Sequence, residues 1–300
     1  MTVSDMTLSV VVAAWNSRAL LERCLTSLED QCAEGDPEII VASNYDNGSS
    51  EMIETRFPRA RFLRMPEGTT VPRLRAEGIR HARGEVVALI EDQCFVDRHW
   101  CAEIRKAHIL PYPAVGGSVE NASTAKAIDW AVYFYDYGRY MLPGVPGAAG
   151  ELPGNNVSYK RAALHEIERT FRNGFFETFI NWELKASGAE LFFAPSAIVY
   201  HNRSYETAEA FSECYHHGRA FAGKRVSGVG LLVRFARALA TLALPFLLSV
   251  RIVLATVGKG RHIKELVLAL PHITLLMVSW SFGELTGYLL GEGGSASRWA

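Results

Sequence analysis

Short apolar segments alternate with helical patterns through the first 90 residues. Four of these segments have the length and hydrophobicity of strands: Leu8–Ala14, Pro37–Ala42, Arg61–Met65 and Val86–Ile90. Between them, apolar residues recur at helical spacing in Ala19–Leu28, Glu51–Phe57 and Val71–Ala82. Strands and helices that alternate in this way predict a parallel, doubly wound α/β sheet. We expect Val86–Ile90 at its centre, because a continuous apolar run is typical of a strand covered on both faces.

Three polar residues, Glu91, Asp92 and Gln93, directly follow the predicted central strand. Open α/β sheets bind ligands in the crevice beyond the carboxyl ends of their strands. Carboxylate oxygens at that edge can hold Mg²⁺ or Mn²⁺, which keeps its remaining positions for the phosphates of a substrate. A solvated acidic turn after a core strand is the alternative interpretation of the same residues.

Composition narrows the class of protein. The chain has 300 residues, 49% of them hydrophobic, and a formal net charge of -1. A charge near zero gives no attractive field for nucleic acid, so we expect no nucleic-acid partner. The five cysteines form no C-x-x-C pair and predict reduced, buried thiols. Residues 1–6 carry no basic n-region, so no secretory signal is predicted and we expect the sheet-forming part in the cytosol.

A dinucleotide-binding dehydrogenase would begin with the same alternation of strands and helices. Its glycine-rich phosphate turn would have to follow the first strand, because only glycine lets a pyrophosphate approach the backbone there. The segment Ala13–Ser17 contains no glycine. The sequence therefore excludes this class.

The ordered motifs resemble those of glycosyltransferase family 2, whose members have the GT-A fold. Ser9–Asn16, Pro37–Asn44 and Leu74–Gln93 follow one another in the order of the family's nucleotide-sugar half. In the family, the corresponding segments end in T-x-N, in D-D-G-S, and in a D-x-D that comes after A-R-N-x-G and A-R-G. The likeness runs from Leu8 to His201. It implies a GT-A-like mixed, mainly parallel sheet flanked by helices.

The resemblance implies a set of donor-binding residues: Ala14, Asn16, Asn44, Asp46, Arg75, Glu91, Asp92 and Gln93. Arg75 falls on the arginine of the A-R-N-x-G helix, and Glu91 and Gln93 fall on the two ends of D-x-D. Gln93 is a neutral amide where the family has its main metal-binding carboxylate, so a metal would be held more weakly. Ser43-Asn44 replaces the family's acidic pair, which leaves Asn44 or Asp46 to meet the nucleobase, and uridine is not fixed as that base.

The second half matches the acceptor side of the family. The implied acceptor-binding residues are Gly117, Gly154, Asn155, Asn156 and Trp182. In the family, an aspartate near the start of a helix is the general base, and counting back from Gly188 places Glu177 on it. Glu183 is the other candidate, with an exposed helix charge as its alternative interpretation. His201 falls where the family often has a histidine that completes the metal site, and a capped surface histidine is the alternative.

Two further segments lie in the second half of the chain. Asp129–Tyr140 is rich in aromatic side chains, which can stack on sugars, lie at a membrane interface or belong to a core helix. Pro143–Gly154 is rich in glycine and proline, and we expect a flexible lid over the bound donor.

The tail differs in composition from the rest. Arg237–Val257 and Leu266–Gly291 are apolar stretches of membrane-spanning length. The basic residues between them would lie on the wrong side for a plain two-span hairpin with a cytosolic sheet domain. The alternatives are an interfacial or re-entrant pair, or a hairpin held against the positive-inside tendency by Arg234 and Arg237. A soluble helical subdomain is a further interpretation. We expect a glycosyltransferase domain over residues 1–225, with halves 1–110 and 111–225, and a membrane-associated helical tail over residues 226–300.

These features and the resemblance imply a membrane-attached glycosyltransferase with its catalytic domain on the cytoplasmic side. It would move a sugar, with inversion, from a nucleotide-sugar donor to a lipid-linked or other glycan acceptor, using Glu177 as base and Mg²⁺ or Mn²⁺ at the leaving diphosphate. The alternative is a catalytically weak or inactive relative that binds a nucleotide sugar or a partner protein, as Gln93 and Ser43-Asn44 indicate. A nucleotidyltransferase ranks last, because no basic glycine-rich loop follows the first strand. The lack of a Q-x-x-R-W stretch argues against a processive polymer synthase.

Overall fold

The computed structural model describes residues 6–298 except 16, 30 and 32–36. The chain divides into two compact units. The sheet unit comprises Met1–Glu120 and Tyr140–Asn202, and the helical unit comprises Asn121–Arg139 and Arg203–Ala300. This division differs from the expected boundary at residue 225. The segment after Glu120 joins the helical unit because its aromatic side chains pack there, as the ring contact between Tyr135 and Trp280 shows.

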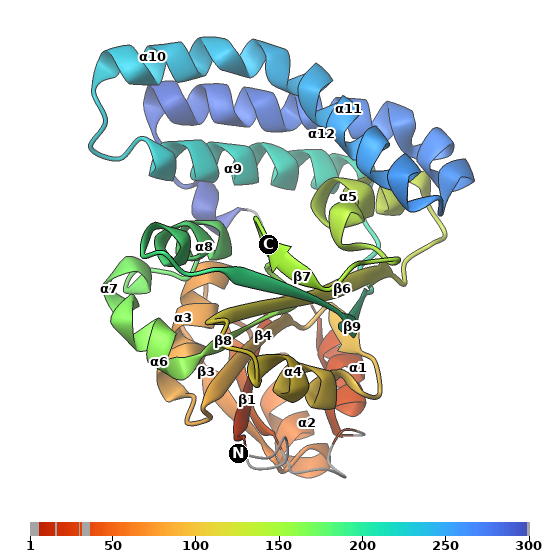
Figure 1. The fold of residues 1–300 in the computed structure, drawn as a ribbon, viewed down its shortest axis with the longest axis vertical. Coiled ribbons are helices and arrows are strands. Elements are labelled where there is room, and N and C mark those ends of the chain that lie inside the picture. Colours follow the sequence, from red (N-terminus) through yellow and green to blue (C-terminus); the bar gives the residue numbers. More distant parts are fainter. Residues whose placement is uncertain (1–5, 16, 30, 32–36, 299–300) are drawn as a thin grey trace. The chain divides into compact units, whose positions relative to one another are not determined.

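The sheet unit contains one nine-stranded sheet in the order β3-β2-β1-β4-β8-β6-β9-β5, with β7 paired to β9 (Figure 1). Its strands are β1 (Leu8–Ala14), β2 (Glu38–Ser43), β3 (Ala60–Arg64), β4 (Val86–Glu91), β5 (Cys94–Val96), β6 (Ala114–Asn121), β7 (Gly147–Ala149), β8 (Val157–Lys160) and β9 (Leu191–His201). The first four pair in parallel, and the pairings of β8 with β4 and β6, and of β9 with β5 and β7, are antiparallel. The expected mixed α/β sheet is confirmed, and β4 lies at its centre.

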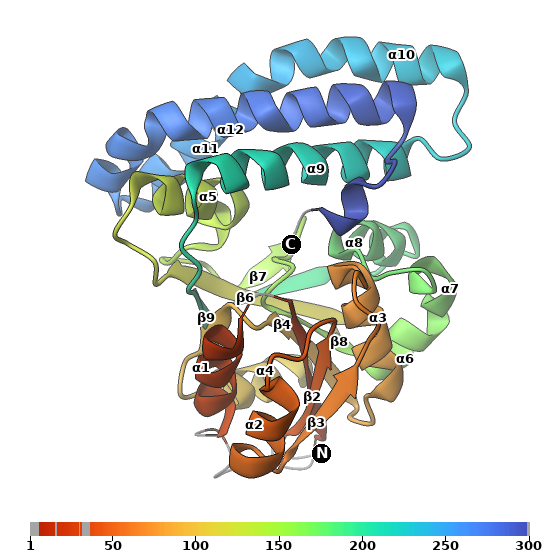
Figure 2. The same ribbon diagram turned by 180° about the vertical axis from the view of Figure 1, so that it is seen from behind.

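Both faces of the parallel half are covered by helices, which explains why its strands read as continuous apolar runs (Figure 2). On β1, Val10 and Val12 face a cluster formed with α1 (Arg18–Glu29), α2 (Ser49–Arg56) and α4 (Trp100–His108). Val11 faces the opposite cluster, formed with α3 (Val71–His81), α6 (Arg161–Glu166), α7 (Glu168–Phe171) and α8 (Glu177–Ala186). Alternate residues therefore supply two cores, as the pleat of a strand requires.

The antiparallel strands bring the second half of the chain to the same sheet. β8 pairs with β4, and β5 pairs with β9 in a register that sets Cys94 opposite His201. Part of the expected lid, Pro143–Gly154, is strand β7, which pairs with β9. Cys24, Cys94, Cys101 and Cys214 are free and buried, as expected, and Cys32 lies outside the described residues.

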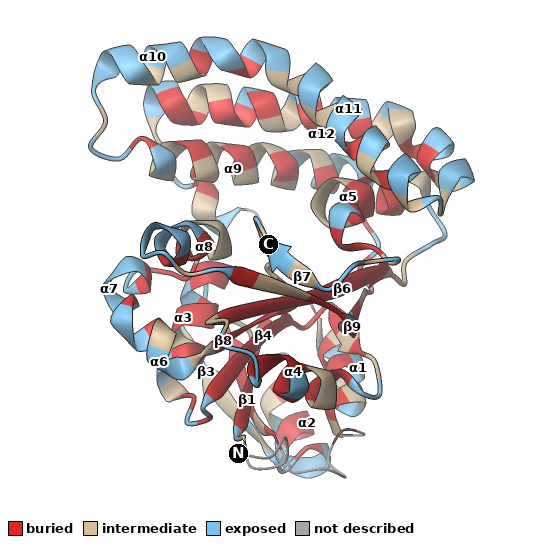
Figure 3. Ribbon diagram, in the orientation of Figure 1, coloured by how far each residue is buried: buried red, intermediate tan, exposed pale blue. Residues whose placement is uncertain are grey.

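The helical unit contains α5 (Ala127–Asp136), α9 (Thr207–Arg225), α10 (Leu231–Ala240), α11 (Leu244–Lys259) and α12 (Ile263–Leu290), with a 3₁₀ turn, η4 (Thr241–Ala243), between α10 and α11. α12 packs on α9 and α5, and α10 and α11 pack on α12. Residues Leu231–Lys259 and Ile263–Leu290 are long and apolar enough to cross a membrane by length and composition. Many side chains on α10 and α11 are exposed (Figure 3).

Candidate active site

An arginine joins two acids at the carboxyl edge of the parallel strands. Arg75 lies on α3 and is buried, and its Nη2 is paired with Glu91 Oε1 at the end of β4. Its Nη1 lies 2.8 Å from Glu177 Oε2, on the first residue of α8. These residues are up to 102 positions apart in the sequence, and they form one ion-paired group at the edge where α/β sheets bind ligands.

Gln93 extends this group. Its Nε2 donates a hydrogen bond of 2.7 Å to Glu91 Oε2, so both carboxylate oxygens of Glu91 have a partner. Gln93 Oε1 is buried and has no hydrogen-bond partner within the described structure. A buried amide oxygen in this condition is an acceptor open to a ligand.

Asp92, in the turn after β4, has other partners than Glu91 and Gln93. Its Oδ2 accepts the backbone N–H of Trp15 at 3.1 Å and the hydroxyl of Tyr45 at 3.4 Å. Burial, followed by the nearby charge of Asp92, raises the pKa of Tyr45 far above its usual value, so the phenol stays protonated as a donor. Asp92 therefore ties the ends of β1 and β2 to that of β4.

The remaining donor-side predictions occupy the ends of β1 and β2. Ala14 ends β1 and is buried, and Asn16 lies outside the described residues. Asn44 follows β2 and donates from Nδ2 to Thr69 O at 2.8 Å. Asp46 accepts from the backbone and hydroxyl of Ser50, and the backbone hydrogen bond is the main reason that its pKa is lowered. Asp46 thus holds the start of α2.

Glu177 is placed by the start of α8 and by a glycine. The free N–H groups at a helix start favour a carboxylate in the first turn. Gly154 lies directly against it: a Cβ on Gly154 would meet Glu177 Cδ at 2.7 Å. The Glu177 side chain keeps 23% of its surface exposed, so it can be reached from solvent while it is paired with Arg75. Glu183 lies on the same helix and is exposed.

The predicted acceptor residues separate into two groups. Asn156 is buried and its side chain is fully engaged: Oδ1 accepts from Trp100 Nε1, and Nδ2 donates to Ser118 O and Ala197 O. A Cβ on Gly117 would meet Ala197 O at 2.0 Å, so this glycine permits close packing of strands. Both residues hold the sheet together, and we see no free group on either.

Asn155 and Trp182 are different. Asn155 is buried, its Nδ2 lies 3.5 Å from Cys94 Sγ, and its Oδ1 has no hydrogen-bond partner within the described structure. Trp182 is 37% exposed and donates from Nε1 to Glu151 Oε1 at 3.0 Å. Asn155 thus presents an unused acceptor beside β5, and Trp182 presents an aromatic surface to solvent.

His201 ends β9, opposite Cys94, and is buried. The next residue, Asn202, donates its N–H to Gln93 O at 2.8 Å, so His201 lies close to the turn that carries Gln93. The fold therefore brings this histidine near Gln93, and a role for it in holding a metal stays a prediction.

The described side chains do not fit a ready site for Mg²⁺ or Mn²⁺. Glu91 is paired with Arg75, and Asp92 Oδ2 accepts from Trp15 and Tyr45. Among the residues described, no group of three His, Cys, Asp or Glu side chains could hold a metal ion. Gln93 Oε1 alone would offer a neutral oxygen, and hard cations require several oxygen ligands.

Tyr45 and Cys94 were not among the residues predicted from sequence. Tyr45 bonds to Asp92, and Cys94 contacts Asn155; burial is the main cause that raises the pKa of the Cys94 thiol well above its usual value. The turn-rich segment around Tyr45 was visible in the sequence, but its partner lies 47 positions away. A single sequence does not reveal contacts of that kind.

Comparison with known proteins now adds to this geometry. A family profile described as "Glycosyl transferase family 2" matches residues 9–168, more than half of the chain. The chain belongs to this family. The match covers the strands β1 to β4 and the site residues from Ala14 to Asn156, and it ends before Glu177.

The chain is also similar to one curated protein and to two solved structures. "Uncharacterized glycosyltransferase YfnE" of Bacillus subtilis (strain 168) is 31% identical over 107 residues, which are 34% of this chain and 27% of that protein. The chain thus matches about a quarter of this relative's length.

The solved structures are more distant in sequence. Mannosyltransferase PcManGT from Pyrobaculum calidifontis, in complex with GDP-Man and Mn²⁺, has a TM-score of 0.58 and 16% identity over 93% of this chain and 87% of its own. GalNAc-T7 with UDP, GalNAc and Mn²⁺ has a TM-score of 0.55 and 16% identity over 67% and 44%. At these identities the likeness concerns the fold alone, and it confirms the expected GT-A-like fold.

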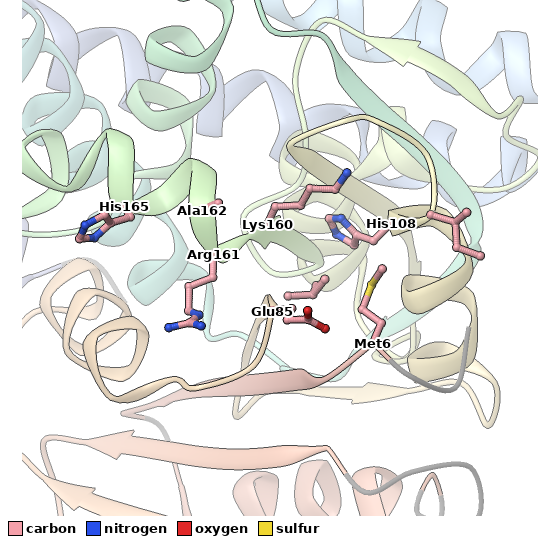
Figure 4. A pocket seen from close by; sticks show the side chains of 9 residues that line it. Met6, Glu85, His108, Lys160, Arg161, Ala162 and His165 are labelled. Carbon is pink, nitrogen blue, oxygen red and sulfur yellow. The ribbon is translucent and has the colours of Figure 1, made fainter. Parts of the chain in front are cut away.

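A cavity of about 690 Å³ lies elsewhere in the sheet unit (Figure 4). It is lined by Met6, Glu85, Val86, His108, Ile109, Lys160, Arg161, Ala162 and His165. Val86 begins β4 and Glu91 ends it, and five residues of strand span roughly 17 Å. The cavity therefore lies at the amino ends of the parallel strands, whereas the candidate site lies at their carboxyl ends. None of the predicted site residues lines the cavity.

Proposed function

We propose that this family 2 protein transfers a sugar from a nucleotide-sugar donor to an acceptor hydroxyl, with inversion at the anomeric carbon. The observation that carries the proposal is the group Glu177–Arg75–Glu91 at the carboxyl edge of the parallel strands. It combines a partly exposed acid, a cation and a buried acid at the place where α/β sheets bind nucleotides.

Glu177 is the proposed general base. Its carboxylate takes the proton of the acceptor hydroxyl while the acceptor oxygen bonds to the anomeric carbon and the bond from that carbon to the diphosphate breaks. Gly154 leaves room beside the carboxylate, since any side chain there would meet it. The start of α8 supports the negative charge before the proton is taken.

Arg75 is the proposed cation for the leaving diphosphate. A guanidinium pairs well with phosphate oxygens and carries five donors, so phosphates entering this edge compete with Glu177 for Nη1. Loss of that pairing would release the Glu177 carboxylate to the acceptor. No step is assigned to a divalent cation, because no group of three His, Cys, Asp or Glu side chains in the described part of the chain could hold one.

The residues proposed to contact the donor and the acceptor are chosen from their positions in the sheet unit. Asn44 and Gln93, with Asp92 behind them, line the ends of β2 and β4, where the nucleotide is proposed to bind. Asn155 and Trp182 are the proposed acceptor contacts. With two apolar helices in the helical unit, we infer attachment to a membrane, a lipid-linked acceptor, and the sheet unit on the cytoplasmic side.

A second function has an observation in its favour. Arg75 neutralises both Glu91 and Glu177, and Gln93 lacks the charge of a metal-binding carboxylate. A group of this kind also fits a protein that binds a nucleotide sugar without transferring it. Both functions require binding of a nucleotide sugar, but only the transferase turns it over.

The test uses the detergent-solubilised full chain. Calorimetry with UDP, GDP and dTDP, each with and without Mn²⁺, identifies the nucleotide, and release of that nucleotide from its sugar esters in the presence of membrane lipid extract measures turnover. We expect Glu177→Gln to lower turnover by about 10²- to 10⁴-fold without weakening nucleotide binding, because Arg75 then loses a competing carboxylate. Glu183→Gln, on the exposed side of the same helix, is the matched control and should retain full turnover.

Three results would count against the proposal. Full turnover in Glu177→Gln would show that Glu177 is not the general base. An equal loss of turnover in Glu183→Gln would show that the effect is not specific to Glu177. Nucleotide binding without any turnover in the parent chain favours the binding protein.

A further inference from the structure

An apolar stripe runs along the outer side of α10, η4 and α11. Its side chains recur at intervals of three or four positions, so they share one face through both helices. All are more than a third exposed: Leu232, Phe235, Leu239, Leu242, Phe246, Val250, Leu254 and Val257. α10 and α11 also pack on α12, and Ala238, Ile252 and Thr256 on these two helices are buried. An exposed apolar stripe of this length indicates a surface that is covered in the working protein.

The charge of the same segment points to what covers it. Residues 231–264 contain Arg234, Arg237, Arg251, Lys259, Arg261 and Lys264, and no aspartate or glutamate. Apolar side chains on one face of a helix together with only cationic charges are typical of helices that lie in the surface of an anionic bilayer. Arg251 is exposed on the flank of the stripe, where a long side chain can extend to the headgroups.

α12 packs along α9, which carries several charged residues. Four glycines permit the backbones of α9 and α12 to approach closely: a Cβ on Gly218 would meet Trp280 O at 2.5 Å, and a Cβ on Gly283 would meet Tyr215 O at 2.2 Å. The contacts continue at Gly287 against Arg219 O and at Gly223 against Glu292 N. The two helices therefore run side by side in the same direction over these contacts, which span about two turns of α9.

This packing bears on whether α12 can cross a membrane. α9 carries five charged residues, Glu209, Glu213, Arg219, Lys224 and Arg225, in 19 positions. A bilayer-crossing α12 would bring its neighbour α9 into the hydrocarbon, where charged side chains are among the most unfavourable groups. The alternative is that α12 and α9 separate, which would expose the glycine contacts and the buried Tyr288 and Met277.

We propose that the helical unit lies in one leaflet of an anionic membrane and does not span it, with α10, η4 and α11 parallel to the bilayer plane and α9 on the water side. α12 lies between them, since both α9 and the pair α10–α11 pack on it. One layer of helix is about 10 Å thick, which fits within the roughly 15 Å of hydrocarbon in a single leaflet. The basic turn between α11 and α12 is then on the same side of the membrane as the sheet unit.

This inference rests on the membrane attachment proposed above and not on glycosyl transfer. Its test therefore reports attachment and topology separately, with the full chain in both cases.

Topology is measured by labelling introduced cysteines with a membrane-impermeant maleimide in vesicles of known sidedness. Lys264→Cys reports the basic turn, and Glu54→Cys on α2 reports the sheet unit; both positions are exposed, and the parent chain gives the background. We expect both cysteines to be labelled from the same face. Labelling of Lys264→Cys from the opposite face, or from neither face, would overturn the one-leaflet arrangement.

Attachment is measured by flotation with vesicles of phosphatidylcholine alone or mixed with phosphatidylglycerol. We expect stronger binding to the anionic vesicles, and a loss of about tenfold or more in Phe246→Glu, whose side chain lies in the stripe. Val145→Glu is the matched control, because Val145 is 85% exposed in the sheet unit. Binding to neither vesicle would overturn the attachment itself, and equal losses in both variants would overturn the role of the stripe.

Discussion

Replacement of Arg75 by methionine tests whether one buried guanidinium holds the candidate site together. The Arg75 side chain is 4% exposed and the Glu91 side chain 7%, so their pair is shielded from water. Removing one partner of a buried pair typically destabilises a protein by about 3–5 kcal/mol, because the other charge stays buried. Glu177 is nearly a quarter exposed, so its share of the loss is small.

Hydrogen exchange of backbone amides in β4 and β5 measures this loss locally. The method suits a chain of two units, because a single unfolding free energy is not defined when units unfold separately. We expect the local opening free energy in Arg75→Met to fall by about 3–5 kcal/mol. Arg73→Met is the matched control: Arg73 is exposed on the same helix, and surface substitutions usually change stability by less than about 0.5 kcal/mol.

A second substitution separates the charge effect from loss of packing. Glu91→Gln in the Arg75→Met background removes the stranded charge and should restore roughly 1–3 kcal/mol, the cost of leaving a buried charged group unsatisfied. Equal protection in Arg75→Met and Arg73→Met would refute the reasoning. So would a double variant no more stable than Arg75→Met.

Three further outcomes follow from the structure. Gly78→Ala should lower the local opening free energy of β1 by about 1–3 kcal/mol in hydrogen exchange, since its Cβ would lie 2.2 Å from Val11 Cγ1; Gly147→Ala, whose Cβ would meet nothing within 4 Å, should leave it unchanged. Burial lowers the pKa of His108 to about 3, so the unfolded chain binds a proton that the folded chain does not, and stability falls as pH decreases through the window from 6.5 to 3. Between pH 7 and pH 5 the parent should therefore lose about 2 kcal/mol more than His108→Gln, and identical pH profiles would exclude this cause. Gln93→Asp should make nucleotide binding more strongly dependent on Mn²⁺, by about tenfold in calorimetry, and an unchanged dependence would show that no cation binds beside it.

The sequence contained most of what places the site. The apolar runs fixed β1, β2 and β4, because strands covered on both faces have little tolerance for polar residues. The carboxyl end of β4 was recognisable from the position of Glu91 alone, since parallel strands present their ends at one edge. The match to the family over residues 9–168 confirms that ordered set of segments.

Only the tertiary structure decided how the site residues are used. Asn156 has the appearance of a ligand-binding amide in the sequence, yet it joins Ser118 and Ala197 inside the sheet. Glu91 and Asp92 are neighbours in the chain, but β4 ends between them and they bond to different partners, Arg75 and Trp15. Side-chain partners depend on residues that are far apart in sequence, and one sequence does not record those distances.

The helical unit shows the same division between sequence and tertiary structure. Sequence determined that two long apolar segments follow residue 225, because hydropathy is a local property of the chain. It did not determine that residues 121–139 belong with them, nor that α12 runs beside α9 through matched glycines. Those facts depend on packing between segments more than 60 positions apart, and this packing determines which apolar faces remain exposed.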